Sequence, residues 1–376
     1  MKIAFVTDQV YLHGGIEKVL SQKANYLADV LGDEVIIITY AQKGNLPCYP
    51  FSNKIQFLDL GVAYQEGISY FHPKNLRQMP SHRAKLRAAL KSLKPDVLVS
   101  CNFGPDFYFL PFIEKGIPKV KEFHGSRYFY EQQAASVKDK FLRRLGSRAE
   151  AAFDAIAVLN QDEIPFYTNK NLVVLPNPTE RSPAQSTVKS KRVLAAGRIS
   201  PVKNFGELID IWSLVAKRFP DWELHFYGED YLGTKAKLEN QIKHLNLGSS
   251  VKFMGVTHSM RTTMLDYSLY ALSSETECFP MVLLESLSMG LPSVCYDVPT
   301  GPKFIIRDGE DGFLVPNKNK VEFAEKMMLL MNEENLRRTM GEAAAKNAER
   351  FEISRVMQSW KDLLQGLVVG KSLKRI

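Results

Sequence analysis

Residues 273–290, S-S-E-T-E-C-F-P-M-V-L-L-E-S-L-S-M-G, connect a predicted strand to a predicted helix and decide how the rest of the chain is interpreted. The apolar run at residues 269–272 predicts a buried strand just before them. The second half of the stretch has Val282, Leu283 and Leu287 at helical spacing. The sequence therefore predicts a strand, a loop and a helix in succession.

Three glutamates are distributed over this unit. Glu275 and Glu277 fall in the loop, at the carboxyl end of the strand, where ligands of parallel sheets bind. Glu285 falls one to two turns inside the helix. Glu277 and Glu285, eight residues apart, can hold one ligand from two sides. Two glutamates at this spacing also occur by chance. The predicted strand before them and the turn at Phe279 and Pro280 therefore also support the interpretation of the pair as a ligand site.

Length and composition indicate a globular chain with two domains. A chain of 376 residues holds two domains at roughly 100 to 200 residues each. No run approaches the ~20 apolar residues of a membrane span, and no signal-peptide pattern precedes the strand at residues 3–6. The cysteines, Cys48, Cys101, Cys278 and Cys295, form neither a metal-binding pair nor a disulfide framework. We therefore predict a cytoplasmic protein.

A formal net charge of +8 favours an anionic partner. Residues 74–94 contain seven basic side chains and no acidic one, and residues 138–148 contain a second basic cluster around the apolar pair Phe141 and Leu142. Both runs are predicted helices. Each can be a solvated face, or it can contact anionic lipid head groups, which attract each nearby Lys or Arg by about 1 kcal/mol. The second interpretation would place the protein at the inner face of a membrane.

Predicted strands alternate with predicted helices along the whole chain, which is the pattern of an α/β fold with parallel sheets. The segment Pro176-Asn177-Pro178 and the residues up to 190 lack apolar periodicity and are a predicted linker. The predicted strands are residues 3–6, 35–39, 55–58, 97–100, 120–123, 155–158 and 172–175 before the linker, and 192–196, 223–227, 251–254, 269–272, 293–297, 305–309 and 312–315 after it.

The first strand after the linker is followed by a predicted anion site. The loop at residues 197–204, G-R-I-S-P-V-K-N, places Arg198 and Lys203 between a strand end and a helix N-terminus. Two cations beside free backbone N–H groups can neutralise a diphosphate without a metal, at about 1.5 to 3 kcal/mol for each charge-assisted hydrogen bond. Either residue alone can also be a solvated loop cation.

Two weaker signals follow strands of the first half. Gly14 and Gly15 come after the first strand, permit close backbone approach and begin a helix whose free N–H groups suit an anionic or hydroxyl-rich ligand. His124 follows the strand predicted at residues 120–123. It can cap the sheet or point toward a ligand.

These motifs together resemble a known family. The pair Glu277-x7-Glu285, the G-R-x4-K-N loop at residues 197–204 and the segment G-G-I-E-K-V at residues 14–19 resemble the retaining glycosyltransferases with two Rossmann-like domains, the GT-B type, and especially family four. The resemblance covers essentially the whole chain and is closest to capsule, O-antigen and other lipid-linked glycan transferases. It implies two parallel sheets facing a central cleft, with an acceptor-side domain at residues 1–178, a nucleotide-sugar domain at residues 179–356, and residues 357–376 crossing back onto the first domain. The helix that makes this crossing is predicted at residues 351–368, where Val356, Trp360 and Leu364 have helical spacing.

The resemblance also implies roles for single residues. It assigns the diphosphate to Arg198 and Lys203, the ribose hydroxyls to Glu285 and the donor-sugar hydroxyls to Glu277. His124 would lie over the reacting sugar. Cys278 stands where the family usually has glycine, and Pro280 removes a backbone N–H that commonly contacts the sugar, so the donor sugar stays open. Further implied donor contacts are Gly15, Phe279, Pro280, Met281 and Val282.

The expected activity is transfer of a hexose or N-acetylhexosamine from a nucleotide-diphosphate sugar, a UDP-sugar in the closest cases, to a glycan acceptor that is lipid-linked. The resemblance implies retention of configuration, and the lack of a D-x-D motif is consistent with a site without metal or other cofactor. One alternative is a UDP-sugar epimerase of the same architecture. Another is a basic nucleic-acid-binding protein, but aromatic residues are not interleaved with the basic runs, so we predict no nucleic-acid partner.

Overall fold

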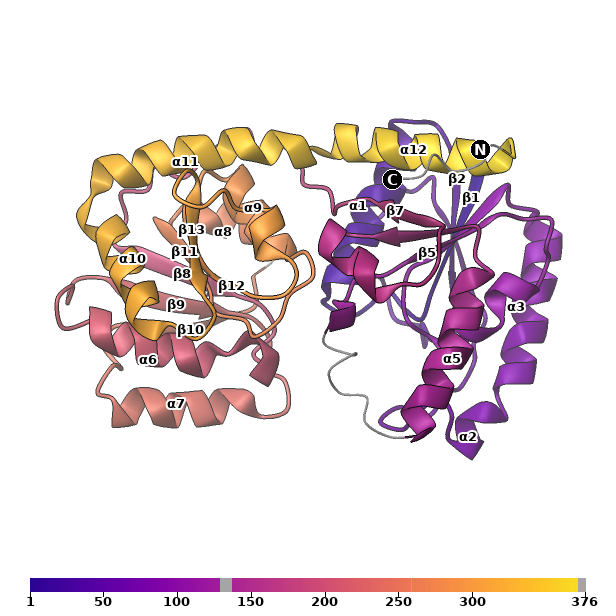
Figure 1. The fold of residues 1–376 in the computed structure, drawn as a ribbon, viewed down its shortest axis with the longest axis horizontal. Coiled ribbons are helices and arrows are strands. Elements are labelled where there is room, and N and C mark those ends of the chain that lie inside the picture. Colours follow the sequence, from indigo (N-terminus) through magenta and orange to yellow (C-terminus); the bar gives the residue numbers. More distant parts are fainter. Residues whose placement is uncertain (129–136, 258, 371–376) are drawn as a thin grey trace. The chain divides into compact units, whose positions relative to one another are not determined.

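The chain forms two compact units, each built around one parallel sheet (Figure 1). The computed structural model describes residues 1–128, 137–257 and 259–370. The first unit comprises Met1–Pro178 and Ile353–Ile376, and the second comprises Thr179–Glu352. All recorded pairings between named strands are parallel, so the prediction of an α/β fold with two parallel sheets is confirmed.

The first unit contains a seven-stranded sheet in the order β3-β2-β1-β4-β5-β6-β7. Its strands are β1 (Lys2–Thr7), β2 (Glu34–Thr39), β3 (Gln56–Asp59), β4 (Val97–Ser100), β5 (Lys119–Glu122), β6 (Ala155–Val158) and β7 (Leu172–Val174). Its helices are α1 (Gly15–Asp29), α2 (Pro73–Leu76), α3 (Met79–Leu93), α5 (Val137–Ala151) and α12 (Ile353–Val368).

The apolar side chains of β1 belong to two core layers, one on each face of the sheet, because successive side chains of a strand point to opposite faces. Ile3 and Phe5 pack with the apolar side of α1 and with α12. Ala4 and Val6 pack on the other face, against α3 and the segment around Phe107. Both faces of the sheet are therefore covered, as expected for a parallel sheet.

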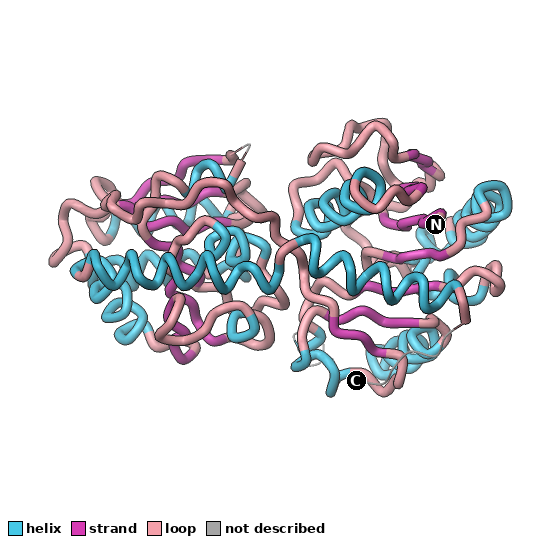
Figure 2. The backbone as a smooth tube through the Cα atoms, turned by 90° about the horizontal axis from the view of Figure 1, so that it is seen from above, coloured by secondary structure: helices cyan, strands magenta, loops and turns pink. Residues whose placement is uncertain are grey.

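The helix α12 completes the first layer and begins within two residues of the start of the helix predicted at residues 351–368. The sequence placed the returning segment at residues 357–376, but the first unit already includes Ile353, and Val356 is 4% exposed within its core. The helix runs over the strands of the first sheet (Figure 2). The ammonium of Lys361 also binds both carboxylate oxygens of Asp33, at 2.5 and 2.6 Å. The apolar residues of the first turn thus belong to the first unit, which moves the boundary to residue 353.

The second unit contains a six-stranded sheet in the order β10-β9-β8-β11-β12-β13. Its strands are β8 (Arg192–Ala196), β9 (Glu223–Tyr227), β10 (Val251–Gly255), β11 (Leu269–Leu272), β12 (Ser293–Asp297) and β13 (Gly312–Pro316). Its helices are α6 (Phe205–Val215), α7 (Thr234–His244), α8 (Met260–Met264), α9 (Met281–Ser288), α10 (Lys320–Asn332) and α11 (Glu334–Ala348).

The strand predicted at residues 305–309 is wrong. Ile305 and Ile306 both donate their backbone N–H to the carbonyl of Pro302, at 2.9 Å, and so continue a short helical turn. Both side chains are buried, which explains their strand-like apolar pattern. Burial without alternation does not distinguish a strand from a turn packed against the core.

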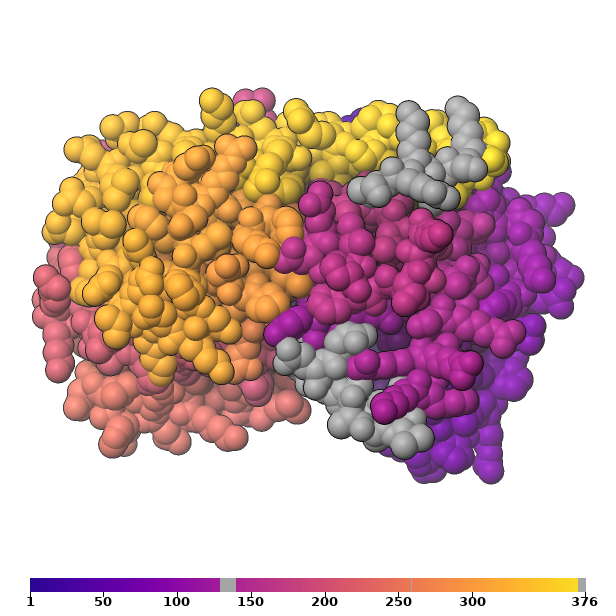
Figure 3. Space-filling model, in the orientation of Figure 1, coloured from indigo at the N-terminus to yellow at the C-terminus, as the bar shows by residue number. Residues whose placement is uncertain are grey.

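The two basic runs lie on helices of the first unit but differ in how they meet solvent. On α3, the Lys85 ammonium donates to the carbonyls of Leu60 and Gly61, and Arg87 pairs with Glu114 at 2.8 Å. On α5, Phe141 and Leu145 are 66% and 37% exposed. Figure 3, in which this part of the chain is magenta, shows it at the surface of the viewed face. The α5 surface thus combines exposed apolar and basic side chains. These are Lys140, Phe141, Arg144, Leu145 and Arg148.

Candidate functional site

The strand order of the second sheet reverses next to β8. From β8 the chain continues to β9 and β10 on one side, and then returns to place β11, β12 and β13 on the other side. The loops that follow β8 and β11 therefore leave the sheet in opposite directions. In open parallel sheets such a switch point is where ligands bind, at the carboxyl ends of the strands.

The loop after β8 is shaped by two glycines with backbone angles that favour glycine. Gly197 has φ +147°, and a Cβ there would lie 3.0 Å from Cε of Lys203, so the Lys203 side chain passes directly over it. Gly228, after β9, has φ +150°, and a Cβ there would lie 1.9 Å from the carbonyl oxygen of Gly197. Glycine at both positions lets the two loops pack together beneath the Lys203 side chain.

Lys203 and Glu277 meet at this switch point. The Lys203 Nζ lies 2.6 Å from Glu277 Oε1, although the two residues are 74 positions apart. Their side chains are 24% and 11% exposed, so the pair is partly open to solvent. A lysine ammonium has three donors, and this contact uses one of them. The remaining donors can bind an anionic ligand while Glu277 holds the ammonium in place.

The Glu277 loop is held by the turn that follows β12. Glu277 and Thr300 form a short parallel bridge, in which Thr300 N–H donates to the Glu277 carbonyl at 2.7 Å. The Thr276 hydroxyl donates to the Pro299 carbonyl at 3.1 Å. A Cβ at Gly301 would lie 2.5 Å from the Cys278 carbonyl oxygen, so this approach requires glycine. The residues after β12 are therefore part of the site, because they fix the backbone that carries Glu277.

Glu285 lies in the second turn of α9 and is 2% exposed. Phe279, Pro280 and Met281 are buried beside it at the start of the helix, and Val282 is half-buried. The first intrahelical bond runs from the Leu283 N–H to the Pro280 carbonyl, at 3.1 Å. The earlier N–H groups of the helix therefore have no intrahelical acceptor and can serve an anion.

Arg198 is exposed and is placed by an aromatic ring. Its guanidinium lies 5.1 Å from the ring centroid of Tyr231. In the described part of the chain no carboxylate forms an ion pair with Arg198, in contrast to Lys203. The structure thus brings Lys203 and Glu277 into contact but leaves Arg198 as a separate cation on the same loop.

His124 and Gly15 belong to the first unit. Strand β5 ends at Glu122, one residue earlier than predicted, so Phe123 separates the strand from His124. His124 Nε2 lies 2.8 Å from Glu122 Oε2. Gly15 is the first residue of α1 and has open space where a Cβ would be, so nothing in the structure requires glycine there. The sequence reasoning did not identify Glu122, although its position two residues before His124 puts it within reach.

The carboxyl ends of β1 and β4, the switch point of the first sheet, carry polar groups, of which the sequence places Asp8 and Asn102 at strand ends but does not single out Asp106. Asp8 follows β1, and Asn102 and Asp106 follow β4. Burial raises the pKa of Asp8, and it raises the pKa of Asp106 to about 6 despite the nearby Lys121. Burial also lowers the pKa of Lys121 to about 8. Asp106 lies further from its strand, in the short turn Pro105–Tyr108, so its burial beside Lys121 has no signal in the sequence.

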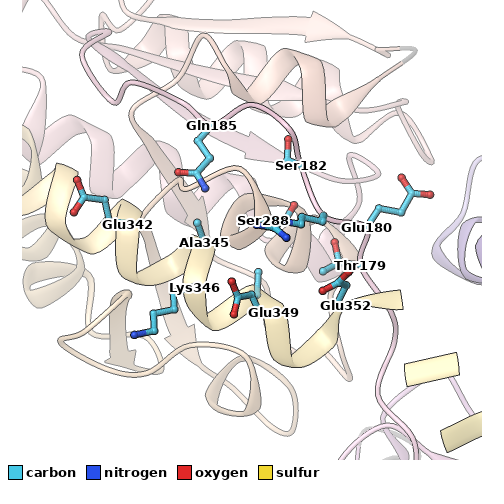
Figure 4. Close-up of a pocket in the computed structure, with 12 residues that line it drawn as sticks. Thr179, Glu180, Ser182, Gln185, Ser288, Glu342, Ala345, Lys346, Glu349 and Glu352 are labelled. Atoms are coloured by element: carbon cyan, nitrogen blue, oxygen red, sulfur yellow. The ribbon is translucent and has the colours of Figure 1, made fainter. Parts of the chain in front are cut away.

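A pocket of about 260 Å³ lies elsewhere in the second unit (Figure 4). Glu342 and Lys346 line it from α11, Glu349 lines it from the short turn after that helix, and Ser288 lines it from the end of α9. None of the predicted site residues lines this pocket. The pocket reaches only the last residue of the helix that carries Glu285, at Ser288, whose hydroxyl donates to the Glu285 carbonyl at 2.9 Å.

No group of three or more His, Cys, Asp or Glu side chains in residues 1–128, 137–257 and 259–370 is arranged to hold a metal ion. Within the same residues, none of the helices has the length and apolar character needed to span a bilayer. Independence of metal stays a prediction.

Two Rossmann-like units of this kind have the fold of the GT-B glycosyltransferases. The chain superposes on sucrose-phosphate synthase from Thermosynechococcus elongatus with a TM-score of 0.81 and 16% identity, over 98% of this chain and 99% of the other. It superposes on the pneumococcal O-GlcNAc transferase GtfA, solved with UDP and GlcNAc, with a TM-score of 0.78 and 15% identity, over 98% and 99%. These likenesses establish the fold.

Sequence comparison establishes the family. The model for "Glycosyl transferases group 1" matches residues 176–347, and the model for "Glycosyltransferase Family 4" matches residues 13–178. This chain belongs to the two-domain glycosyltransferases that these two models describe, and it is a glycosyltransferase.

Three relatives align over nearly the whole of both chains. An uncharacterised glycosyltransferase of Haemophilus influenzae is 28% identical, over 96% of this chain and 99% of its own length. An amylovoran biosynthesis glycosyltransferase of Erwinia amylovora is 25% identical, over 96% and 99%. An α-1,4-N-acetyl-D-galactosaminyltransferase of Campylobacter jejuni, named for an undecaprenol-linked glycan substrate, is 27% identical, over 97% and 98%.

Proposed function

We propose that this chain transfers a hexose or an N-acetylhexosamine from a UDP-sugar to a lipid-linked glycan acceptor during synthesis of a surface polysaccharide. The observation that carries the proposal is the contact between Lys203 and Glu277 at the switch point of the second sheet. It joins a cation for the donor diphosphate to a carboxylate for sugar hydroxyls. The names of the relatives from Erwinia and Campylobacter support the substrate class.

In this proposal the second unit binds the donor. Negative charge accumulates on the diphosphate as the bond to the sugar breaks, and Lys203 and Arg198 stabilise that charge together with the first N–H groups of α9. Glu277 accepts hydrogen bonds from sugar hydroxyls, and Glu285 accepts them from the ribose. No step uses a metal, because the two cations supply the charge that a metal would otherwise supply.

The transfer itself retains the configuration of the sugar. The bond from the anomeric carbon to the phosphate oxygen breaks, and the acceptor hydroxyl oxygen bonds to the same face of that carbon. The proton of the acceptor hydroxyl passes to the leaving phosphate oxygen. His124 contacts the reacting sugar, and the polar groups after β1 and β4, including Asp8 and Asn102, bind hydroxyls of the acceptor.

The experiment that tests this function is a binding and turnover screen. The chain is titrated with UDP-, GDP- and ADP-sugars, and the donors that bind are then incubated with and without an undecaprenol-linked oligosaccharide, in excess chelator. We expect a UDP-sugar to bind and to extend the acceptor. Conversion of the donor to another UDP-sugar without acceptor would indicate an epimerase, and turnover that returns only with magnesium or manganese would contradict the metal-free site.

We also propose that α5 holds the enzyme at an anionic bilayer. Phe141 and Leu145 are exposed four residues apart, on one side of the helix, with Arg144 next to them. Apolar side chains among basic ones are typical of helices that lie at a membrane surface. On α3, by contrast, Lys85 and Arg87 already have partners within the unit.

Vesicle cosedimentation tests this surface. Binding to anionic vesicles should fall as salt rises, and it should be lost when Phe141→Ser is combined with Arg144→Glu. The control is Arg83→Glu on α3, which reverses one charge without touching the apolar pair. Equal binding to neutral and anionic vesicles, or equal losses in both variants, would favour the interpretation of α5 as a solvated face.

A further inference from the structure

A buried polar chain connects His124 to the last helix of the first unit. One carboxylate oxygen of Glu122 lies 2.8 Å from His124 Nε2, and the other pairs with the ammonium of Lys23 on α1. Glu122 and Lys23 are 4% and 2% exposed, so neither side chain can touch a substrate. Any effect that they have on catalysis therefore passes through His124.

The series of polar contacts from His124 through Glu122 to Lys23 ends at an aromatic ring of α12. The Lys23 ammonium lies 3.8 Å from the ring centroid of Trp360 and 5.8 Å from that of Phe5. A cation over the face of an indole is attracted by the negative face of the ring, most strongly where water is excluded. Trp360 is 4% exposed within the core that α1 and α12 share. The position of Lys23 thus depends on a helix that is more than three hundred residues away in sequence.

Glu122 fixes which nitrogen of His124 carries a proton. Burial alone would raise the pKa of Glu122, but Lys23 and His124 together lower it to about 2, so the carboxylate stays ionised at neutral pH. An ionised carboxylate only accepts hydrogen bonds, which means that Nε2 of His124 must be the donor. In neutral His124 the unprotonated nitrogen is then Nδ1, which is left to accept a hydrogen bond from a hydroxyl.

Two other ionisable groups lie near Glu122, but neither of them takes the place of Lys23 or His124 as its partner. Lys121 is adjacent in sequence but points to the opposite face of β5, because side chains alternate along a strand. Its ammonium donates to the carbonyl of Ser100, at 3.2 Å. Cys101 faces Glu122 from the end of β4, and burial raises the pKa of its thiol well above the usual value, so it stays neutral.

We propose that Glu122 and Lys23 are positioning residues that hold His124 as the Nε2–H tautomer, and that Trp360 of α12 keeps Lys23 in place. This proposal rests on the proposed function in one respect, which is the role of His124 at the donor sugar. The position and tautomer of His124 are properties of the first unit that can be measured without any substrate.

The test uses histidine tautomers in the full-length chain. In ¹⁵N-histidine NMR spectra, the His124 signals are assigned by their loss in His124→Gln, and they should show a single Nε2–H tautomer in the wild type. The double variant Lys23→Met with Glu122→Gln removes both buried charges at once, which avoids leaving either one uncompensated. A glutamine can donate as well as accept, so we expect the two tautomers to become mixed.

Variants of the aromatic ring test the connection to α12. Trp360→Leu removes the ring face and should mix the tautomers, whereas Trp360→Phe keeps an aromatic face and should preserve the Nε2–H form. Lys361→Met is the matched control, because it removes the contact of α12 with Asp33 without touching Lys23. If Lys361→Met mixes the tautomers as strongly as Trp360→Leu, loosening of the helix explains the effect and the proposal is wrong.

Kinetics with the donor identified by the screen provide the second measurement. The double variant should lower kcat about tenfold and leave the donor KM within about twofold, as expected for a group that is misplaced in the transition state. An unchanged kcat together with a single Nε2–H signal would overturn the proposal. If no donor is turned over, the proposed function fails, but the tautomer spectra still decide the positioning role.

Discussion

At the scale of single residues, the structure changes how the two motif glutamates should be understood. Glu277, the proposed ligand of the donor sugar, also holds the ammonium of Lys203 through its carboxylate, at 2.6 Å. Glu285 is buried in the second turn of α9 and is 2% exposed. Substitutions of the two glutamates are therefore expected to change different kinetic constants.

Glu285→Gln should mainly raise the donor KM, because ribose contacts contribute equally to the ground and transition states. Glu277→Gln should mainly lower kcat, because it weakens contacts that matter as the sugar ring gains positive charge and leaves Lys203 less well held. Steady-state kinetics and UDP titration separate the two outcomes. Loss of UDP binding in Glu277→Gln, or unchanged constants in Glu285→Gln, would show that the roles are misassigned.

Two buried carboxyl groups of the first unit should give opposite dependences of stability on pH. The pKa of Glu122 is lowered from 4.5 to about 2, so its contribution is fully present above pH 4.5 and is lost as the pH falls toward 2. The pKa of Asp106 is raised by burial from 3.8 to about 6, so its contribution is lost as the pH rises from 3.8 to 6.

Chemical denaturation of Glu122→Gln and Asp106→Asn at several pH values checks these signs. Compared with the wild type, Glu122→Gln should lose less unfolding free energy between pH 4.5 and 2, and Asp106→Asn should lose less between pH 3.8 and 6. Parallel pH profiles for both variants and the wild type would mean that neither carboxyl group has the environment described.

At the scale of elements, the site depends on glycines that let neighbouring loops touch. Gly228 has φ +150°, and a Cβ there would lie 1.9 Å from the Gly197 carbonyl oxygen. Gly228→Ala should therefore cost about 2 kcal/mol or more of unfolding free energy and weaken donor binding, since it displaces the loop under Lys203. Gly248→Ala is the control, because nothing lies within 4 Å of a Cβ there. Equal stabilities of the two variants in denaturant would contradict this packing.

Most strands of the fold could be predicted from the sequence, because apolar runs between turns mark them locally. The strand predicted at residues 305–309 fails because Ile305 and Ile306 are buried in a turn, where the same apolar pattern arises for another reason. The contact between Glu122 and Lys23 could not be predicted, since it joins side chains 99 positions apart on a strand and a helix with no shared motif. Lys203 and Glu277 were found because both lie in motifs of a known family.

At the scale of the whole molecule, the two units differ in how they can be separated. The second unit is continuous, and its ends lie side by side, because the Thr179 N–H donates to the Phe351 carbonyl at 2.8 Å. The first unit is interrupted, and it relies on α12 for part of its core, including Met357 and Leu364. The second unit is therefore formed by one continuous range of residues, whereas the core of the first unit needs two separate ranges.

Residues 179–352 expressed alone should fold cooperatively and bind UDP, because the proposed donor contacts and a separate hydrophobic core lie within them. They should not transfer sugar, since His124 and the acceptor contacts lie in the first unit. Residues 1–178 alone should be strongly destabilised by the loss of α12. Denaturation curves and UDP titrations measure both expectations, and a stable residue 1–178 fragment would show that α12 is dispensable for the core.

The central claim is that the switch point of the second sheet binds the donor diphosphate through Lys203 and Arg198. The most direct measurement is the kcat/KM for donor transfer of Lys203→Ala and Arg198→Ala beside Lys252→Ala, a control that removes a surface lysine paired with Glu223. We predict that each of the first two variants loses at least about tenfold, equivalent to ~1.4 kcal/mol of transition-state stabilisation, and that Lys252→Ala stays near wild type. Activity within about twofold of wild type for both Lys203→Ala and Arg198→Ala would show that these two residues do not bind the diphosphate.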